Sequence, residues 1–442
     1  MFKKQVYNDL FYTLISRLWR LISGPILLLF IPLFLDPEQQ GYWYLFASIA
    51  SLSLLADLGF GMLVLKFSAH EYAFLHFTDG GLLAGDELYL KRLGSLFRFI
   101  IRRVILLCVI AFPIIYFVGI AFFVRDGVLN VYWIPWSLYS FGAMINFFSN
   151  FVLFFIEGLN KIASIQKIRL VALIVYTGIV PVSLFAGGNI YALAFGMLAS
   201  ACFILILTIC KFKTVLKQIL DISFSFFYDW KKEINPLLKR YMIGGAFGWF
   251  VFQIYVPVTH YFHGPVYSGK VGITLALVMS LLDISSIWIY TVIPKINMFV
   301  SKKMWGNLDS LFSQRMKLSL GTYILGVGVA GIFLLYFNEL WIFPQILARF
   351  LPFRVMFILF ACYLFQLIIS NLAIYLRSHK QEPLMWQAIL AFCWIVPTTM
   401  FVAMNFSPEW IFSGFLSSYV FLIPINLFIF FKCRREWHNI QS

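Results

Sequence analysis

Two aspartates, Asp57 and Asp283, interrupt long apolar stretches of the chain and are its first candidates for chemistry. An ionisable group at membrane depth costs several kcal/mol unless it is paired or faces water. Each carboxylate could therefore couple a proton or another cation, or pair with a cation in a cavity. The alternatives are a buried hydrogen bond between helices and a position at the membrane interface.

Five basic residues could meet an anionic cargo within the membrane region. Arg17 and Arg20 lie three residues apart, so they share one helix face. Lys66, Arg169 and Lys270 lie near the ends of other apolar stretches. All five could line a cavity that holds phosphate. The alternative for Arg17, Arg20 and Lys66 is that they extend to lipid headgroups, as long basic side chains near helix ends do, and the alternative for Lys270 is an ordinary surface lysine.

Neutral polar residues at helical spacing could contact sugar hydroxyls. Asn146 and Asn150 lie one helical turn apart, and Gln253 and Asn371 lie in two other apolar stretches. Contacts between membrane helices are the commoner use of such side chains.

Other chemistries lack their motifs in this sequence. There is no glycine-rich loop ending in Lys-Ser/Thr for nucleotide phosphates, no nucleophile elbow and no cluster of metal ligands. The six cysteines show neither zinc-ligand spacing nor a disulfide pattern. We therefore expect no catalytic residue, cofactor or metal, and a protein that is not an enzyme.

These residues must be positioned by membrane helices. The chain is 62% hydrophobic and 12% charged, against about 45–50% and about 25% in soluble domains. A helix needs about 20 apolar residues to cross the hydrocarbon layer. This length recurs twelve times, and the predicted spans are 11–35, 41–65, 99–124, 131–157, 165–186, 189–210, 237–262, 268–294, 318–337, 353–376, 384–404 and 410–431.

The net charge of +15 is explained by membrane orientation rather than by nucleic acid. With the N-terminus inside, 30 of the 34 Lys and Arg fall on cytoplasmic segments or the adjoining helix ends. Both termini are then cytoplasmic, and the first span is expected to be an uncleaved anchor. The inner loops 67–98 and 211–236 mix cations with Phe, Leu and Trp, so we expect helices there that lie in the interface against anionic lipids.

A weak internal repeat divides the chain into halves. Pro37-Glu38-Gln39-Gln40-Gly41 leads into the second span, and Pro265-Val266-Tyr267-Ser268-Gly269 leads into the eighth, 228 residues later. Ser53-Leu54-Leu55-Ala56-Asp57 likewise resembles Ser280-Leu281-Leu282-Asp283. The fold class predicted is an all-α polytopic membrane protein with two parallel six-helix repeats around a central cavity. The lobes would be residues 1–214 and 237–442, with a basic cytoplasmic linker at 215–236.

Five segments resemble bacterial polysaccharide-export flippases. They are Pro37 to Tyr42, Ala56-Asp57-Leu58-Gly59-Phe60-Gly61, Glu157-Gly158-Leu159-Asn160-Lys161, Gly264 to Gly269, and Tyr375 to Pro383. On these segments the chain is similar to the Wzx-type O-antigen flippases of the multidrug/oligosaccharidyl-lipid/polysaccharide exporter superfamily.

That resemblance implies transport by alternating access in the bacterial inner membrane. The implied cargo is an undecaprenyl-pyrophosphate-linked oligosaccharide, moved from the cytoplasmic to the periplasmic leaflet for lipopolysaccharide biosynthesis. A proton or sodium gradient would drive it, and a polysaccharide polymerase and a chain-length regulator are candidate partners. The cationic cavity would fall on Arg17, Arg20, Lys66, Arg169 and Lys270.

Two other functions stay open on the sequence. A multidrug exporter of the same superfamily should have an acidic cavity, whereas buried acids are few here. A membrane O-antigen polymerase or ligase typically exposes a large outer loop, and the longest outer loop predicted here has about fifteen residues.

Overall fold

The computed structural model of the chain is almost entirely helical. It describes residues 26–223, 226–336, 343–379 and 383–439, together with 11–12, 15–16, 19 and 23–24. Two compact units are present: unit 1 comprises Met1–Ser23 and Phe46–Ala246, and unit 2 comprises Gly24–Leu45 and Phe247–Ser442.

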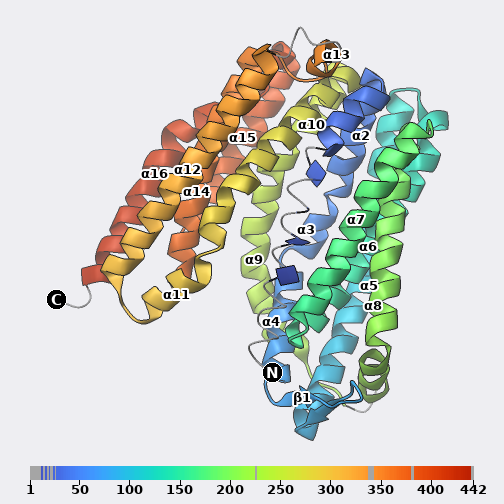
Figure 1. Cartoon of the computed structure of the whole chain (residues 1–442), viewed down its shortest axis with the longest axis vertical. Helices are drawn as coiled ribbons and strands as arrows, with labels where there is room; N and C mark the ends of the chain where they lie inside the picture. The colour runs from blue at the N-terminus through green and yellow to red at the C-terminus, as the bar shows by residue number, and fades with distance from the viewer. Residues whose placement is uncertain are drawn as a thin grey trace. The chain divides into compact units, whose positions relative to one another are not determined.

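Unit 1 is a helical bundle with one small hairpin. Figure 1 shows α5, α6, α7 and α8 lying side by side. Helix α2 (Pro37–Ala50) enters the unit at its C-terminal end, and α9 (Trp230–Gln253) leaves it. The other elements are α3 (Ser53–Asp57), α4 (Phe60–Tyr72), β1 (Leu75–Phe77), β2 (Leu83–Gly85), α5 (Glu87–Arg125), α6 (Leu129–Gly158), α7 (Ile162–Phe185) and α8 (Tyr191–Ser223).

Unit 2 is a second bundle built around α10. A continuous apolar core includes Tyr255, Val271, Leu359, Tyr363 and Phe415. Its elements are α10 (Tyr255–Tyr290), α11 (Ile293–Ser301), α12 (Trp305–Tyr336), α13 (Phe343–Leu347), α14 (Phe353–Ser378), α15 (Met385–Asn405), the 3-10 turn η2 (Pro408–Trp410) and α16 (Ser413–Asn439).

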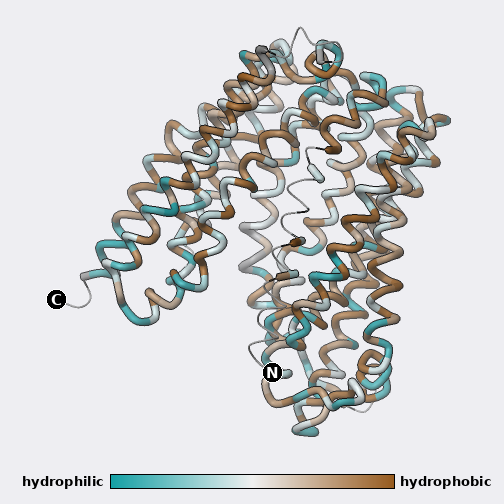
Figure 2. Tube along the Cα trace, in the orientation of Figure 1, coloured by the Kyte–Doolittle hydropathy of each residue, from teal (hydrophilic) through white to brown (hydrophobic). Residues whose placement is uncertain are grey.

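The predicted fold class is confirmed: this is a multi-pass, all-α membrane protein. Within the described residues, nine helices are long and apolar enough to span a membrane, or ten if the bent pair Pro37–Asp57 and Phe60–Tyr72 counts as one span. Apolar residues fill the middle of the long helices, and polar residues gather toward their ends (Figure 2). One of these stretches, Gly245–Ser301, covers most of the predicted seventh and eighth spans, which separate at a backbone break at Gly264 with φ 81° and ψ 175°.

The segment 67–98, predicted to be an inner loop, differs from the interfacial helices expected there. It forms an antiparallel hairpin in which Leu75 pairs with Gly85 and Phe77 with Leu83. Thr78-Asp79-Gly80-Gly81 supplies the turn, with Gly81 at φ 76°, a conformation that glycine adopts without steric strain. The Gln218 amide on α8 holds the hairpin by two 2.8 Å hydrogen bonds to the backbone of Leu83.

Helix α5 begins two residues after the end of the hairpin and well before its predicted span. The Asp86 side chain accepts a 2.8 Å hydrogen bond from the backbone N–H of Leu88, which caps the helix. Apolar periodicity alone located the membrane part of α5 but not this polar extension.

Candidate functional site

A break in the second span positions Asp57. Helix α3 ends at this residue, Leu58 and Gly59 adopt left-handed conformations (φ 44° and 84°), and α4 begins at Phe60. The Asp57 carboxylate then accepts a 2.8 Å hydrogen bond from the backbone N–H of Gly61. The first N–H groups of a helix lack partners within it and carry partial positive charge, so they stabilise a carboxylate at this place.

Asp57 faces a cavity of about 360 Å³ inside unit 1. Its wall combines polar groups with aromatic rings: Ser51, Ser53, Asp57, Tyr139, Asn146, Asn150, Phe147, Phe151 and Phe154, completed by small or aliphatic residues of α2, α3, α6 and α8. The structure thus brings together Asp57 and Asn146, which the sequence singled out separately. Asn150, one turn beyond Asn146, donates 2.9 Å and 3.2 Å hydrogen bonds to the Asn146 backbone and side-chain oxygens.

Arg169 lies close to this cavity but is already paired. Its guanidinium is 3.0 Å from the Glu157 carboxylate on α6 and stacks 5.5 Å from the centre of the Phe154 ring. Lys66 lines a separate pocket of about 290 Å³ that also contains Glu233. Each of these two predicted cavity cations therefore lies near a carboxylate of its own unit.

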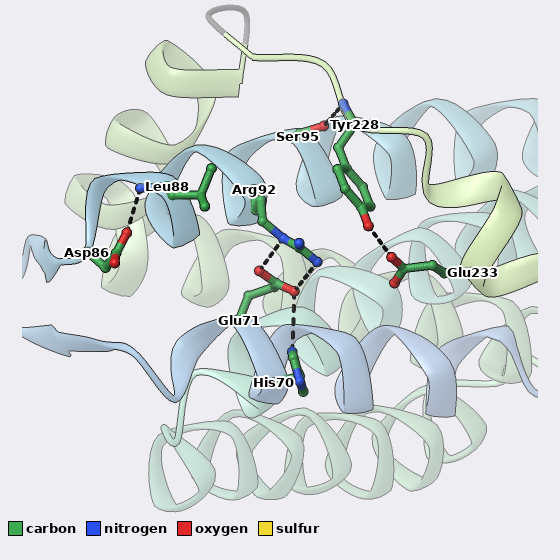
Figure 3. Close-up of polar contacts among 8 residues, drawn as sticks. All are labelled: His70, Glu71, Asp86, Leu88, Arg92, Ser95, Tyr228 and Glu233. Carbon is green, nitrogen blue, oxygen red and sulfur yellow. Dashed lines mark hydrogen bonds and ion pairs between the residues drawn. The ribbon is translucent and has the colours of Figure 1, made fainter.

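A buried ion pair ties α4 to α5 in unit 1 (Figure 3). Arg92 Nε and Nη2 donate bidentate hydrogen bonds of 2.8 Å and 3.0 Å to the fully buried Glu71 carboxylate. The same guanidinium stacks 4.4 Å from the centre of the Tyr228 ring and 5.4 Å from that of Trp230. The Tyr228 hydroxyl donates to Glu233, and this hydrogen bond raises the pKa of the phenol. The contacts fix the segment that leads into α9.

Two of the segments that resemble the flippases meet in unit 2. A Cβ at Gly41 would lie 2.1 Å from the carbonyl oxygen of Pro265, and one at Gly269 would lie 2.9 Å from the Gly41 nitrogen. Only glycine allows this close backbone crossing. Beside it, the buried Gln40 amide donates to the carbonyls of Gly269 (2.9 Å) and Arg349 (3.3 Å).

Lys270 and Arg349 line a pocket of about 330 Å³ at this crossing. Its described lining is Pro37, Gln40, Val266, Lys270, Gln345, Ala348 and Arg349, which includes no carboxylate. Arg349 Nη2 donates a 2.8 Å hydrogen bond to the Leu35 carbonyl. Burial lowers the pKa of Arg349, an effect that nearby Asp36 opposes. The pocket is a partly desolvated cationic site.

The remaining predicted residues lie elsewhere. Gln253 ends α9 and is half-buried, and Asp283 is exposed on α10. Arg17 and Arg20 lie outside the described residues. Across the described residues, no group of three His, Cys, Asp or Glu side chains could hold a metal ion.

No family model matches this chain, and no curated protein matches it. Solved structures match over nearly its whole length. A multidrug resistance MATE family transporter of the MOP superfamily, in an inward-facing conformation, is 12% identical with a TM-score of 0.64, covering 97% of this chain and 96% of that one. The chain shares the fold of a MATE transporter.

Two further structures agree with that likeness. The MATE multidrug transporter DinF-BH, solved as a complex, is 14% identical with a TM-score of 0.59, covering 98% of this chain and 96% of that one. The lipid II flippase MurJ, in an inward closed conformation, is 13% identical with a TM-score of 0.56, covering 95% and 86%. These likenesses show the fold that this chain shares with MATE transporters and MurJ, while the resemblance to Wzx-type flippases stays a prediction.

Sequence reasoning missed Arg349 and the Glu71–Arg92 pair. Arg349 lies on the short connection after α13, far from Lys270 in the chain, and only its departure from the positive-inside pattern marked it. Glu71 is an isolated acid beside His70 at the end of a span, which resembles an ordinary interfacial residue. Its burial depends on Arg92, twenty-one residues later, which no local pattern indicates.

Proposed function

We propose that this protein is a flippase that moves an undecaprenyl-pyrophosphate-linked oligosaccharide from the cytoplasmic to the periplasmic leaflet of the bacterial inner membrane by alternating access. The observation that carries the proposal is the cationic pocket of unit 2. It forms where two of the flippase-like segments cross, and it holds Lys270 and Arg349 with no carboxylate among its described lining residues.

The chemistry of the pocket suits a pyrophosphate. A charged phosphate group loses its hydration on leaving water, and fixed cations must replace that hydration. Lys270 is half-buried and Arg349 is desolvated by burial, so both gain from a bound anion. Lys270 also departs from the positive-inside pattern, on the side that the cargo would reach after crossing.

Ion coupling belongs, in this proposal, to the cavity of unit 1. A carboxylate held at a helix break, with two amides and two serines around it, offers oxygen ligands to a proton or sodium ion. Binding there could change the bend between α3 and α4, because the Asp57 carboxylate also accepts a hydrogen bond from the first turn of α4.

The test is translocation in proteoliposomes. Purified protein is reconstituted with fluorescent undecaprenyl-pyrophosphate-linked oligosaccharide, and a membrane-impermeant reagent that destroys the label reports the outer-leaflet fraction over time. We expect protein-dependent movement that Lys270→Glu slows at least tenfold, since the reversed charge repels the pyrophosphate. Arg354→Glu is the matched control: it makes the same charge change at an exposed site at the start of α14, outside the pocket. Equal rates in the two variants would remove the pocket from the cargo path.

A second candidate is export of a cationic drug, and the unit 1 cavity favours it. One carboxylate, Asp57, sits there among the rings of Tyr139, Phe147, Phe151 and Phe154, which suits a flat organic cation. The same proteoliposomes separate the candidates. Uptake of ethidium that depends on Asp57 and not on Lys270, without movement of the lipid-linked sugar, would establish drug export.

A further inference from the structure

A basic pocket of about 720 Å³ lies in unit 1, away from the Asp57 cavity. It is formed between the first half of α5 and the chain from Phe227 to Asn235, where α9 begins. Pockets of about 300–1,000 Å³ are large enough for small-molecule ligands. Neither proposed transport site uses it.

The charge of this pocket is strongly positive. Arg98, Arg102, Arg103 and Lys231 line it, and Asp229 is the one carboxylate among its described lining residues. Asp229 lies 3.9 Å from Lys232, which offsets its charge. Arg102 is exposed and has no hydrogen-bond or ion-pair partner within the described chain. An anion would therefore meet four cationic side chains and one carboxylate, and the guanidinium of Arg102 is available to pair with it.

The walls are held in place without a ligand. Arg98 Nη2 donates a 3.5 Å hydrogen bond to the Phe226 carbonyl, and Arg103 Nη1 donates a 3.1 Å one to Asn235 Oδ1. The backbone N–H of Tyr228 donates to Ser95 Oγ at 3.2 Å (Figure 3). Arg92, which is held by its ion pair with buried Glu71, stacks against the Tyr228 and Trp230 rings. Such preorganisation lowers the entropy lost on binding.

The pocket continues into an apolar surface along α5. Arg98, Arg102 and Leu106 follow at four-residue spacing, so they share one face of the helix. Between Leu106 and Val124 the exposed residues of α5 are apolar and include Val109 and Phe117, and Phe227 is exposed on the opposite wall. The arginines thus stand where a lipid-facing helix surface gives way to the polar boundary of the membrane.

We infer that this pocket binds the phosphate-bearing headgroup of a membrane lipid, with the lipid tails lying along the apolar face of α5. Arginine clusters bind phosphate by bidentate hydrogen bonds, and basic pockets at the membrane boundary are a recurrent form of lipid recognition. The inference goes beyond the proposed function and does not depend on it, because the pocket and Lys270 lie in different units. The lipid would be either an anionic glycerophospholipid or a polyprenyl diphosphate, which share this phosphate chemistry.

Native mass spectrometry of the delipidated full-length protein in detergent tests the inference. Phosphatidylglycerol, phosphatidylcholine with the same acyl chains, and undecaprenyl diphosphate are titrated separately. We expect at least one of the two anionic lipids to bind about tenfold tighter than phosphatidylcholine. Arg102→Gln should weaken that binding about tenfold, the usual effect of losing one charged hydrogen bond, and Arg102→Lys should weaken it less. Whichever anionic lipid shows the larger dependence on Arg102 is the ligand.

Arg125→Gln is the matched control, because it removes the same charge at the opposite end of α5. Its affinities should stay within about twofold of the wild-type values, since the change lies outside the pocket. Arg102 is exposed, so its variants should fold, and unchanged melting temperatures check this. The inference is overturned if phosphatidylcholine binds as tightly as both anionic lipids, or if Arg102→Gln and Arg125→Gln behave alike. Displacement of the lipid by an equal concentration of inorganic pyrophosphate would also overturn it, because the site would then bind soluble anions.

Discussion

Asp57 in unit 1 and Asp283 in unit 2 have matching places in the sequence and different places in the structure. Asp57 ends α3, caps α4 and faces a polar cavity. Asp283 lies within the regular part of α10 and is exposed. The following residues explain the difference. Leu58 and Gly59 turn left-handed after Asp57, whereas Ser285 and Ser286 continue the helix after Asp283, their hydroxyls donating to the Leu281 and Leu282 carbonyls.

The two units also differ in how they accommodate acids. In the described residues, Glu71 of unit 1 is the only fully buried Asp, Glu, Lys or Arg side chain. The best-connected acid of unit 2, Asp309, remains partly exposed while it accepts hydrogen bonds from Arg434 (2.6 Å and 3.1 Å) and Tyr375 (2.8 Å). Glu71 is therefore held more tightly in the fold than Asp309, and its removal should have the larger effect.

The largest expected effect comes from Glu71→Gln. Removing one partner of a buried ion pair leaves the other charge uncompensated, which destabilises proteins by about 3–5 kcal/mol. We expect a decrease of this size in the free energy of unfolding, measured by titration with sodium dodecyl sulfate in mixed micelles. Adding Arg92→Met should restore part of the loss, because no unpaired charge then remains.

Glu87→Gln is the control for that measurement. Glu87 also pairs with a cation, Lys91 at 2.6 Å, but its side chain is 78% exposed. Exposed pairs contribute about 0–1 kcal/mol. A similar loss in Glu87→Gln and Glu71→Gln would mean that the burial of Glu71 has no energetic consequence.

A smaller effect is expected at Asp57, where two variants separate its structural role from its charge. Asp57→Ala removes the cap of α4 and should lower the free energy of unfolding by about 0.5–2 kcal/mol. Asp57→Asn keeps an oxygen that accepts from the Gly61 N–H, so stability should stay near that of the wild type. If Asp57 couples ions, the Asp57→Asn variant should still lose the dependence of transport on a proton or sodium gradient in proteoliposomes. If Asp57→Asn keeps that dependence, the role of Asp57 is limited to capping α4.

The sequence was sufficient for the fold class because each membrane helix must satisfy its own backbone hydrogen bonds and bury about 20 apolar residues. That constraint is local, so composition and length reveal it. The polar start of α5 and the hairpin before it were missed, because they depend on the Asp86 cap, a glycine turn and the distant Gln218. These contacts lie outside the membrane spans, where the apolar signal ends.

The candidate site was only partly predictable for a related reason. Asp57 and Asn146 were identified as polar residues within apolar spans, but their meeting in one cavity depends on how the second span packs against α6. Lys270 was marked by its departure from the charge pattern, but its neighbour Arg349 is supplied by a distant connection. Repeat similarity also suggested equal roles for Asp57 and Asp283. The match between the two sequences does not show that the helix breaks after Asp57 and continues after Asp283.

Of the substitutions at Glu71, Asp57 and Asp283, Asp283→Asn should have the smallest effect on stability and transport. Its side chain is exposed and lies in an unbroken helical segment, and substitutions at exposed sites usually change stability by less than about 0.5 kcal/mol. Asp57 lines a polar cavity, whereas Asp283 is exposed on its helix. Gradient-dependent transport should therefore persist in Asp283→Asn and be lost in Asp57→Asn. The two variants make the same chemical change at matching sequence positions, so each is the control for the other. If Asp283→Asn abolished gradient dependence and Asp57→Asn did not, the coupling site would lie in unit 2, and the helix break at Leu58 and Gly59 would serve only to shape the second span.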